Sequence, residues 1–61
     1  MTLPSDPIIL LSYVNTQLRD TYPSLDELCA ALCVEKYELV EKLDAIGYYY
    51  DSGTNRFIPA V

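Results

Sequence analysis

The sequence contains no histidine and no tryptophan, and it has only four basic residues against nine acidic ones. The absence of histidine removes the commonest general acid–base and the commonest metal ligand of proteins. The formal net charge of −5 disfavours a phosphate-binding surface, so neither nucleic acid nor an anionic membrane is an expected partner. No motif places a base beside a nucleophile. We therefore expect no enzyme and no cofactor.

Long hydrophobic runs and a secretory leader are also lacking. The N-terminal segment has no basic region, and Pro4 and Pro7 interrupt it early. The chain has 21% charged residues, which argues against a membrane-spanning segment. Its 51% hydrophobic residues argue against intrinsic disorder. A length of 61 residues has room for one core only. We expect a single cytoplasmic domain over residues 1–61.

The chain has two cysteines, Cys29 and Cys33, which lie four positions apart. On a helix they would share one face. A structural zinc site requires four Cys or His ligands, so two thiols in one chain fall short of it. We interpret both as small buried thiols in a reducing compartment, and we expect no metal.

Three segments have helical periodicity, and we expect helices over about residues 7–21, 24–33 and 36–46. Asp6 is a suitable N-cap for the first helix, with Pro7 at its first position. Ser24 and Glu27 form a capping box before the second. Gly47 is the expected left-handed residue after the third. The residues expected to be almost fully buried are Leu28, Leu32, Leu39, Leu43 and Ile46.

After Gly47 the pattern changes to that of a β-hairpin over about residues 48–58. Tyr48, Tyr49 and Tyr50 have high strand propensity, residues 51–55 are typical of a turn, and Pro59 ends the second strand. The predicted fold class is mostly α (α+β), a three-helix, helix-turn-helix-like bundle followed by a C-terminal β-hairpin.

This arrangement resembles a small winged helix-turn-helix, a family whose turn usually carries glycine where Cys33 stands. The residues that carry the resemblance are Leu28, Cys29, Leu32, Cys33, Val34, Leu39, Leu43, Ile46, Gly47 and Tyr48.

A second resemblance covers nearly the whole chain. It is carried by residues 3–7, 10–15, 18–20, 24–29 and 46–48, which look like a family of small bacterial proteins known only as a domain of unknown function. That resemblance implies a stand-alone bacterial cytoplasmic protein, and it implies no activity and no site residues.

The charges of the third helix decide between two functions. Its outward face is expected to carry Tyr37, Glu38, Glu41 and Asp44, and three carboxylates would repel the phosphates beside a major groove. The favoured function is therefore a non-catalytic module that binds another protein or a second copy of itself. The alternative is a winged-helix nucleic-acid-binding or transcription-associated protein.

Six tyrosines in 61 residues point to where such a module would bind. In a strand, Tyr48 and Tyr50 face one way and Tyr49 the other, so at least one ring faces away from the helices. Tyrosine is enriched in protein interfaces, but an exposed tyrosine is equally compatible with simple solvation. The possible interaction surface consists of Ile9, Tyr13, Tyr37 and Tyr49, and is called the candidate surface below.

Overall fold

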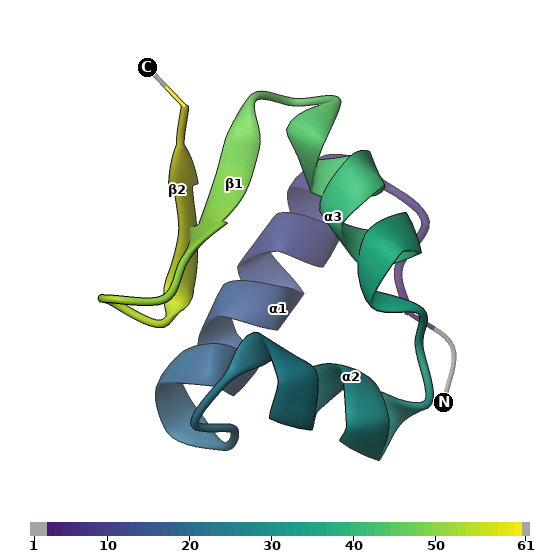
Figure 1. Cartoon of the computed structure of the whole chain (residues 1–61). Coiled ribbons are helices and arrows are strands. Elements are labelled where there is room, and N and C mark those ends of the chain that lie inside the picture. Colours follow the sequence, from purple (N-terminus) through teal and green to yellow (C-terminus); the bar gives the residue numbers. More distant parts are fainter. Residues whose placement is uncertain (1–2, 61) are drawn as a thin grey trace.

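The computed structural model describes residues 3–60 and contains three helices followed by a two-stranded antiparallel hairpin (Figure 1). This α+β architecture confirms the predicted order of elements. The elements are α1 (Pro7–Asp20), α2 (Leu25–Leu32), α3 (Lys36–Asp44), β1 (Tyr48–Asp51) and β2 (Arg56–Pro59).

Local capping signals position the first two helices as expected. The Asp6 carboxylate accepts hydrogen bonds from the amides of Ile8 (2.8 Å) and Ile9 (3.2 Å), which satisfies two of the free N–H groups at the start of α1. The Ser24 hydroxyl accepts from the Glu27 amide at 3.2 Å. Both helices therefore begin where a side chain replaces the missing backbone acceptor.

The end of α2 has an unusual backbone. Cys33 is its C-cap, with φ 56° and ψ 43°, in the left-handed region that normally favours glycine. The Val34 amide donates to the Cys29 carbonyl at 3.0 Å, which closes the turn. Three residues then separate α2 from α3, so the two short helices must turn sharply against each other.

The third helix ends two residues earlier than predicted, at Asp44 instead of Ile46. The amides of Ile46 and Gly47 donate to carbonyls three residues back, at Leu43 (3.2 Å) and Asp44 (2.9 Å), which tightens the last turn. Gly47 has φ 81°, the left-handed conformation expected of it. The chain thus leaves the helix before Ile46 can join its buried face.

The hairpin has the predicted position. Tyr50 lies opposite Phe57, and Tyr49 opposite Ile58. The rings of Tyr50 and Phe57 lie 5.6 Å apart and are tilted by 56°, a favourable aromatic geometry. Tyr49 is exposed while Tyr48 and Tyr50 are half-buried, which confirms the expected alternation.

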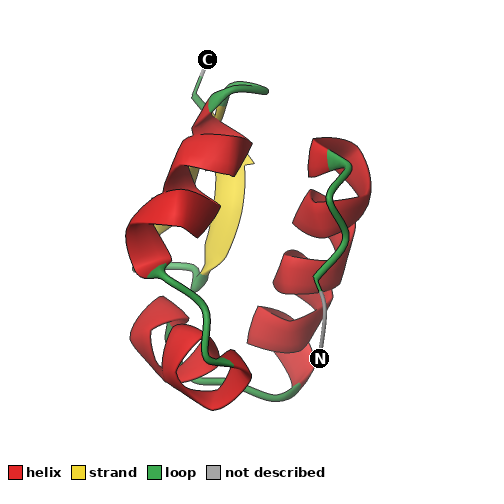
Figure 2. Cartoon of the chain, turned by 90° about the vertical axis from the view of Figure 1, so that its right-hand side faces the viewer, coloured by secondary structure: helices red, strands yellow, loops and turns green. Residues whose placement is uncertain are grey.

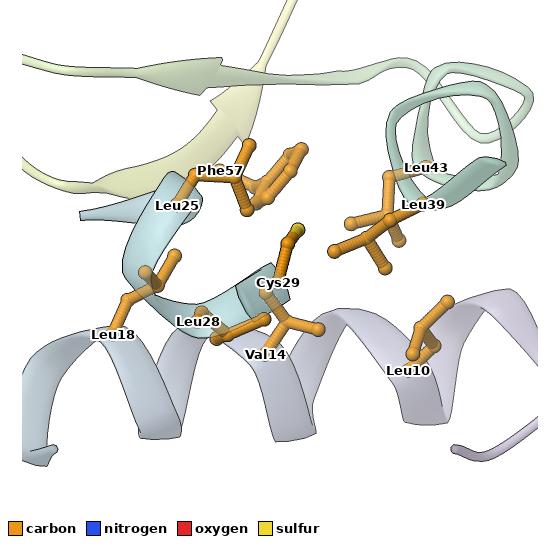
Figure 3. Packing of buried hydrophobic residues seen from close by; sticks show 9 residues of the cluster. All are labelled: Leu10, Val14, Leu18, Leu25, Leu28, Cys29, Leu39, Leu43 and Phe57. Carbon is orange, nitrogen blue, oxygen red and sulfur yellow. The ribbon is translucent and has the colours of Figure 1, made fainter. Parts of the chain in front are cut away.

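The core lies between the hairpin and α1, with α2 and α3 at its ends (Figure 3). Figure 2 shows the same arrangement from the side, with α3 in front of the hairpin and α1 on the other side of the view. The buried residues of the core are Leu10, Val14, Leu18, Leu25, Leu28, Cys29, Leu39, Leu43 and Phe57.

Two of the five predicted core residues are placed differently. Leu28, Leu39 and Leu43 are buried, but Leu32 and Ile46 are only partly buried and pack against the edge of the cluster. Leu32 is the last residue of α2, and Ile46 lies in the turn beyond α3. Both residues therefore lie at the edge of the core and not at its centre.

Within residues 3–60, no helix combines the length and the apolar character that crossing a bilayer requires.

Replacing Leu43 by alanine is expected to unfold most of the protein. Leu43 is 0% exposed, and such truncations cost about 2–5 kcal/mol, against a total stability of about 5 kcal/mol for a small domain. Urea unfolding followed by circular dichroism measures the loss. Ile46→Ala, at the edge of the core, is the control and should cost clearly less. Equal stability of Leu43→Ala and the wild type would contradict this packing.

Candidate functional site

A shallow groove runs between α1 and the β2 side of the hairpin, and is called the α1–β2 groove below. Its α1 wall carries Ile8, Leu11, Ser12, Asn15, Thr16, Leu18 and Arg19, and its hairpin wall carries Tyr48, Thr54, Asn55 and Arg56. The α1 positions recur every three or four residues, so one side of the helix forms the whole wall.

Asn15 joins the two walls. Its side-chain oxygen accepts a hydrogen bond from the Phe57 amide at 2.8 Å, and its side-chain nitrogen donates to the Phe57 carbonyl at 3.1 Å. These are the two bonds that a neighbouring strand residue would make. Asn15 therefore closes the outer edge of β2 where a third strand would otherwise pair.

Asn55 joins the hairpin to the end of α1. Its side-chain nitrogen donates to the carbonyls of Leu18 and Tyr22, both at 3.0 Å, and its oxygen accepts from the Tyr50 hydroxyl at 2.6 Å. That hydroxyl in turn accepts from the Leu25 amide at 3.3 Å. Leu18 lies in the last turn of α1 and Leu25 in the first turn of α2, where backbone groups lack helical partners. The hairpin thus caps both helix ends at this corner.

The backbone of Asn55 fits this role. Its φ is 53°, and asparagine is one of the few residues other than glycine that adopts the left-handed region readily. We call the connected side chains and backbone groups of Asn55, Tyr50, Leu18, Tyr22 and Leu25 the Asn55 network.

The groove changes character along its length. Ile8, 62% exposed, lies with Leu11 and Tyr48 at one end. Arg19 and Arg56 are two of the four basic residues of the chain. No Asp or Glu occurs among the described residues that line the groove.

The two arginines differ in their pairing. Arg19 makes two bonds of 2.8 Å to the carboxylate of Asp20, and the Arg19 guanidinium lowers the pKa of that carboxyl. Arg56 makes no ion pair within residues 3–60, although it lies opposite Asp51 in the register of the hairpin. Arg56 is therefore the groove cation without an ion pair among residues 3–60, although it interacts with the charge of Asp51 and helps to lower the pKa of that carboxyl.

The candidate surface is spread over three elements. Ile9 and Tyr13 lie one turn apart on α1, Tyr37 lies on α3 and Tyr49 on β1. Ile9, Tyr37 and Tyr49 are exposed, whereas Tyr13 is partly buried against the core.

The structure does not gather these side chains into one patch. At 100° per residue, Tyr13 lies about 160° around α1 from Asn15, and Asn15 contacts the hairpin. Ile9 and Tyr13 therefore face away from the hairpin that carries Tyr49.

Sequence reasoning did not single out Asn15, Asn55 and Arg56, which line the α1–β2 groove. Asn55 was assigned to turn chemistry, which its left-handed backbone bears out. Its partners lie 33 and 37 residues away in the sequence. The one available signal was an asparagine, Asn15, next to the apolar positions of the first helix.

Neither cysteine is part of the groove lining. Burial, followed by the charge of Asp26, raises the pKa of the Cys29 thiol, so this thiol stays protonated at neutral pH and is a poor nucleophile. The prediction of two buried thiols is correct for Cys29 and wrong for Cys33, which is exposed at the C-cap of α2; both thiols are free. Among residues 3–60, no three His, Cys, Asp or Glu side chains lie close enough together to hold a metal ion.

We expect the Asn55 network to stabilise the fold measurably. Asn55→Gly keeps the left-handed backbone unstrained but removes three hydrogen bonds, and should cost about 1–3 kcal/mol in urea unfolding. Tyr50→Phe should cost about 1 kcal/mol. The double variant should lose less than the sum, since both changes break the same network.

Tyr49→Phe is the control for this series. It removes the hydroxyl of an exposed tyrosine on the same strand and should change the stability by no more than about 0.5 kcal/mol. Strict additivity of Asn55→Gly and Tyr50→Phe would contradict a connected network.

Acidification is expected to weaken the hairpin turn through Asp51. The Thr54 hydroxyl donates to its carboxylate at 2.7 Å and the Gly53 amide at 3.3 Å. The Thr54 bond is the largest cause that lowers the pKa of Asp51; partial desolvation opposes it, and the Gly53 and Thr54 amides and Arg56 add to it. Because the folded pKa is below the unfolded value of about 3.9, the stabilisation is present above that value and is lost as the pH falls through the folded pKa.

A carbon-detected NMR titration of the Asp51 carboxyl measures this directly. We expect a midpoint below that of an unstructured aspartate, and a smaller pH dependence of stability in Asp51→Asn. A midpoint at or above the ordinary value would contradict the hydrogen-bonded turn.

Comparisons with known proteins place the chain in a family but give it no activity. No curated protein and no solved structure matches it. A family model matches residues 4–57, a range that includes the three helices, β1, Asn15 and the Asn55 network. The match covers well over half of the chain, and the chain belongs to the family described as Domain of unknown function (DUF4250).

Proposed function

We propose that this chain is a non-catalytic interaction module that binds another protein or a second copy of itself. The observation that carries the proposal is the exposure of large apolar side chains on a very small domain. Ile8 is 62% exposed, Ile9 59%, Tyr37 81% and Tyr49 46%. Aromatic side chains with a polar tip are enriched at the centres of protein interfaces.

The outer face of the hairpin is the best-defined part of this exposed surface. Tyr49 lies directly opposite Ile58, and residues opposite each other on one face of a sheet are in contact distance. Ile58 is partly exposed. The pair forms a small apolar surface on a rigid element, which supports Tyr49 as the leading contact residue.

The chemistry of the buried cysteine supports a function without thiol catalysis. The raised pKa of Cys29 disfavours a thiolate nucleophile.

The alternative is a winged-helix nucleic-acid-binding protein. One observation favours it: Cys33 adopts the left-handed conformation that glycine usually supplies in the turn of a helix-turn-helix. The charge of α3 opposes it, since Glu38, Glu41 and Asp44 are all exposed on this helix. A salt series discriminates the two functions, because real phosphate contacts lose affinity steeply with added salt.

Sedimentation over a hundredfold concentration range tests the proposed function. A homodimer would dissociate on dilution, and Tyr49→Ser should shift it towards the monomer while Tyr49→Phe, which keeps the ring, should not. For a protein partner, Tyr49→Ser should reduce capture from the native cytoplasm. If wild type and variant both stay monomeric and every captured partner remains bound to Tyr49→Ser, the hairpin face is not the binding surface.

A further inference from the structure

The α1–β2 groove has two chemically different ends on one helix. Ile8 and Arg19 are eleven residues apart on α1, which at 1.5 Å per residue is about 16 Å. Leu11 and Tyr48 extend the apolar end, and Arg56 on β2 adds to the charge. Along β2, Arg56 lies three residues from Pro59, the residue opposite Tyr48, and three residues of extended peptide cover that distance of about 10 Å.

The charge of the groove differs from that of the molecule. The chain carries a net charge of −5, yet the described lining residues include two arginines and no carboxylate. The guanidinium of Arg19 is paired with the carboxylate of Asp20. The guanidinium of Arg56 has no ion-pair partner within residues 3–60. A carboxylate of the bound segment would share Arg56 with Asp51, which lies opposite it in the hairpin and whose pKa Arg56 helps to lower.

The edge of β2 determines how such a segment would be held. Asn15 occupies the amide and carbonyl of Phe57, and Pro59 has no N–H to offer. An added strand could not form a continuous ladder along this edge. The segment would be held by its side chains, with an apolar residue near Ile8 and a carboxylate on Arg56.

We propose that the α1–β2 groove binds a short extended segment of another protein, with an apolar side chain at one end and a carboxylate about three residues away. The proposal rests on the proposed function as an interaction module and names the chemistry of its partner. The acidic segment pairs with Arg56 by a charge-assisted hydrogen bond, and the apolar residue covers Ile8, Leu11 and Tyr48.

Selection from a random heptapeptide display library against the immobilised protein tests this without assuming a sequence. We expect enriched peptides to combine a large apolar residue with Asp or Glu three or four positions away, and to bind less tightly as salt is raised. Amide NMR shifts on adding one selected peptide should fall on α1 and β2.

Two pairs of matched variants distinguish the groove from general charge and hydrophobicity. Arg56→Gln should weaken binding about tenfold, while Lys42→Gln, which removes the same charge from α3, should change it less than about twofold. Ile8→Ser should weaken binding about tenfold. Ile9→Ser should not, since Ile9 is almost equally exposed but does not line the groove.

Several results would overturn the proposal. The first is a selection that enriches no peptide over a bare surface. The second is a set of enriched peptides without acidic residues. The third is an equal loss of affinity in the two variants of either pair. Self-association abolished by Arg56→Gln would assign the groove to a second copy instead. A failed selection combined with Tyr49-dependent association would reject the groove alone and leave the proposed function standing.

Discussion

The three-way hydrogen bonding of Asn55 is the constraint on which the rest of the structure depends. A two-stranded hairpin is not stable by itself, and two short helices meeting at a corner leave backbone groups without partners. Asn55 and Tyr50 satisfy the carbonyls of Leu18 and Tyr22 and the amide of Leu25. The same bonds hold the hairpin over the core, so that Phe57 is 2% exposed.

The docked hairpin also creates the groove. Asn15 holds β2 beside α1 without allowing a further strand to pair there, and the space between them remains lined by side chains. Consequently the two sides of α1 differ: Ile8 faces the groove, while the adjacent Ile9 faces away from it. The hairpin face around Tyr49 and the groove that contains Arg56 are thus two separate surfaces of the molecule.

The local signals in the sequence predicted much of the fold, because each acts within a few residues. Asp6 and Ser24 accept hydrogen bonds from amides two or three positions away. Gly47 ends α3 through its own left-handed backbone conformation. Ile46 was misplaced because helical periodicity does not show where α3 stops, and Leu32 because periodicity does not show how far along α2 the core extends. Asn15 bonds to a residue 42 positions away, and no pattern in a single sequence reveals such a pair. The same limit applies to the candidate surface. The exposure of Ile9, Tyr37 and Tyr49 could be predicted from their positions in the helices and the strand. Their distance from one another and the existence of the groove depend on how the elements pack, which local patterns do not show.

Amide hydrogen exchange at Phe57 tests most directly whether asparagine side chains hold the hairpin on the helices. The Phe57 N–H points away from β1 and is bonded to Asn15, so an unattached hairpin would leave it open to water. The account predicts that Phe57 exchanges as slowly as the core amide of Val14 in α1 and only through global unfolding. Exchange of Phe57 near the rate of an unstructured peptide, with Val14 still protected, would contradict it.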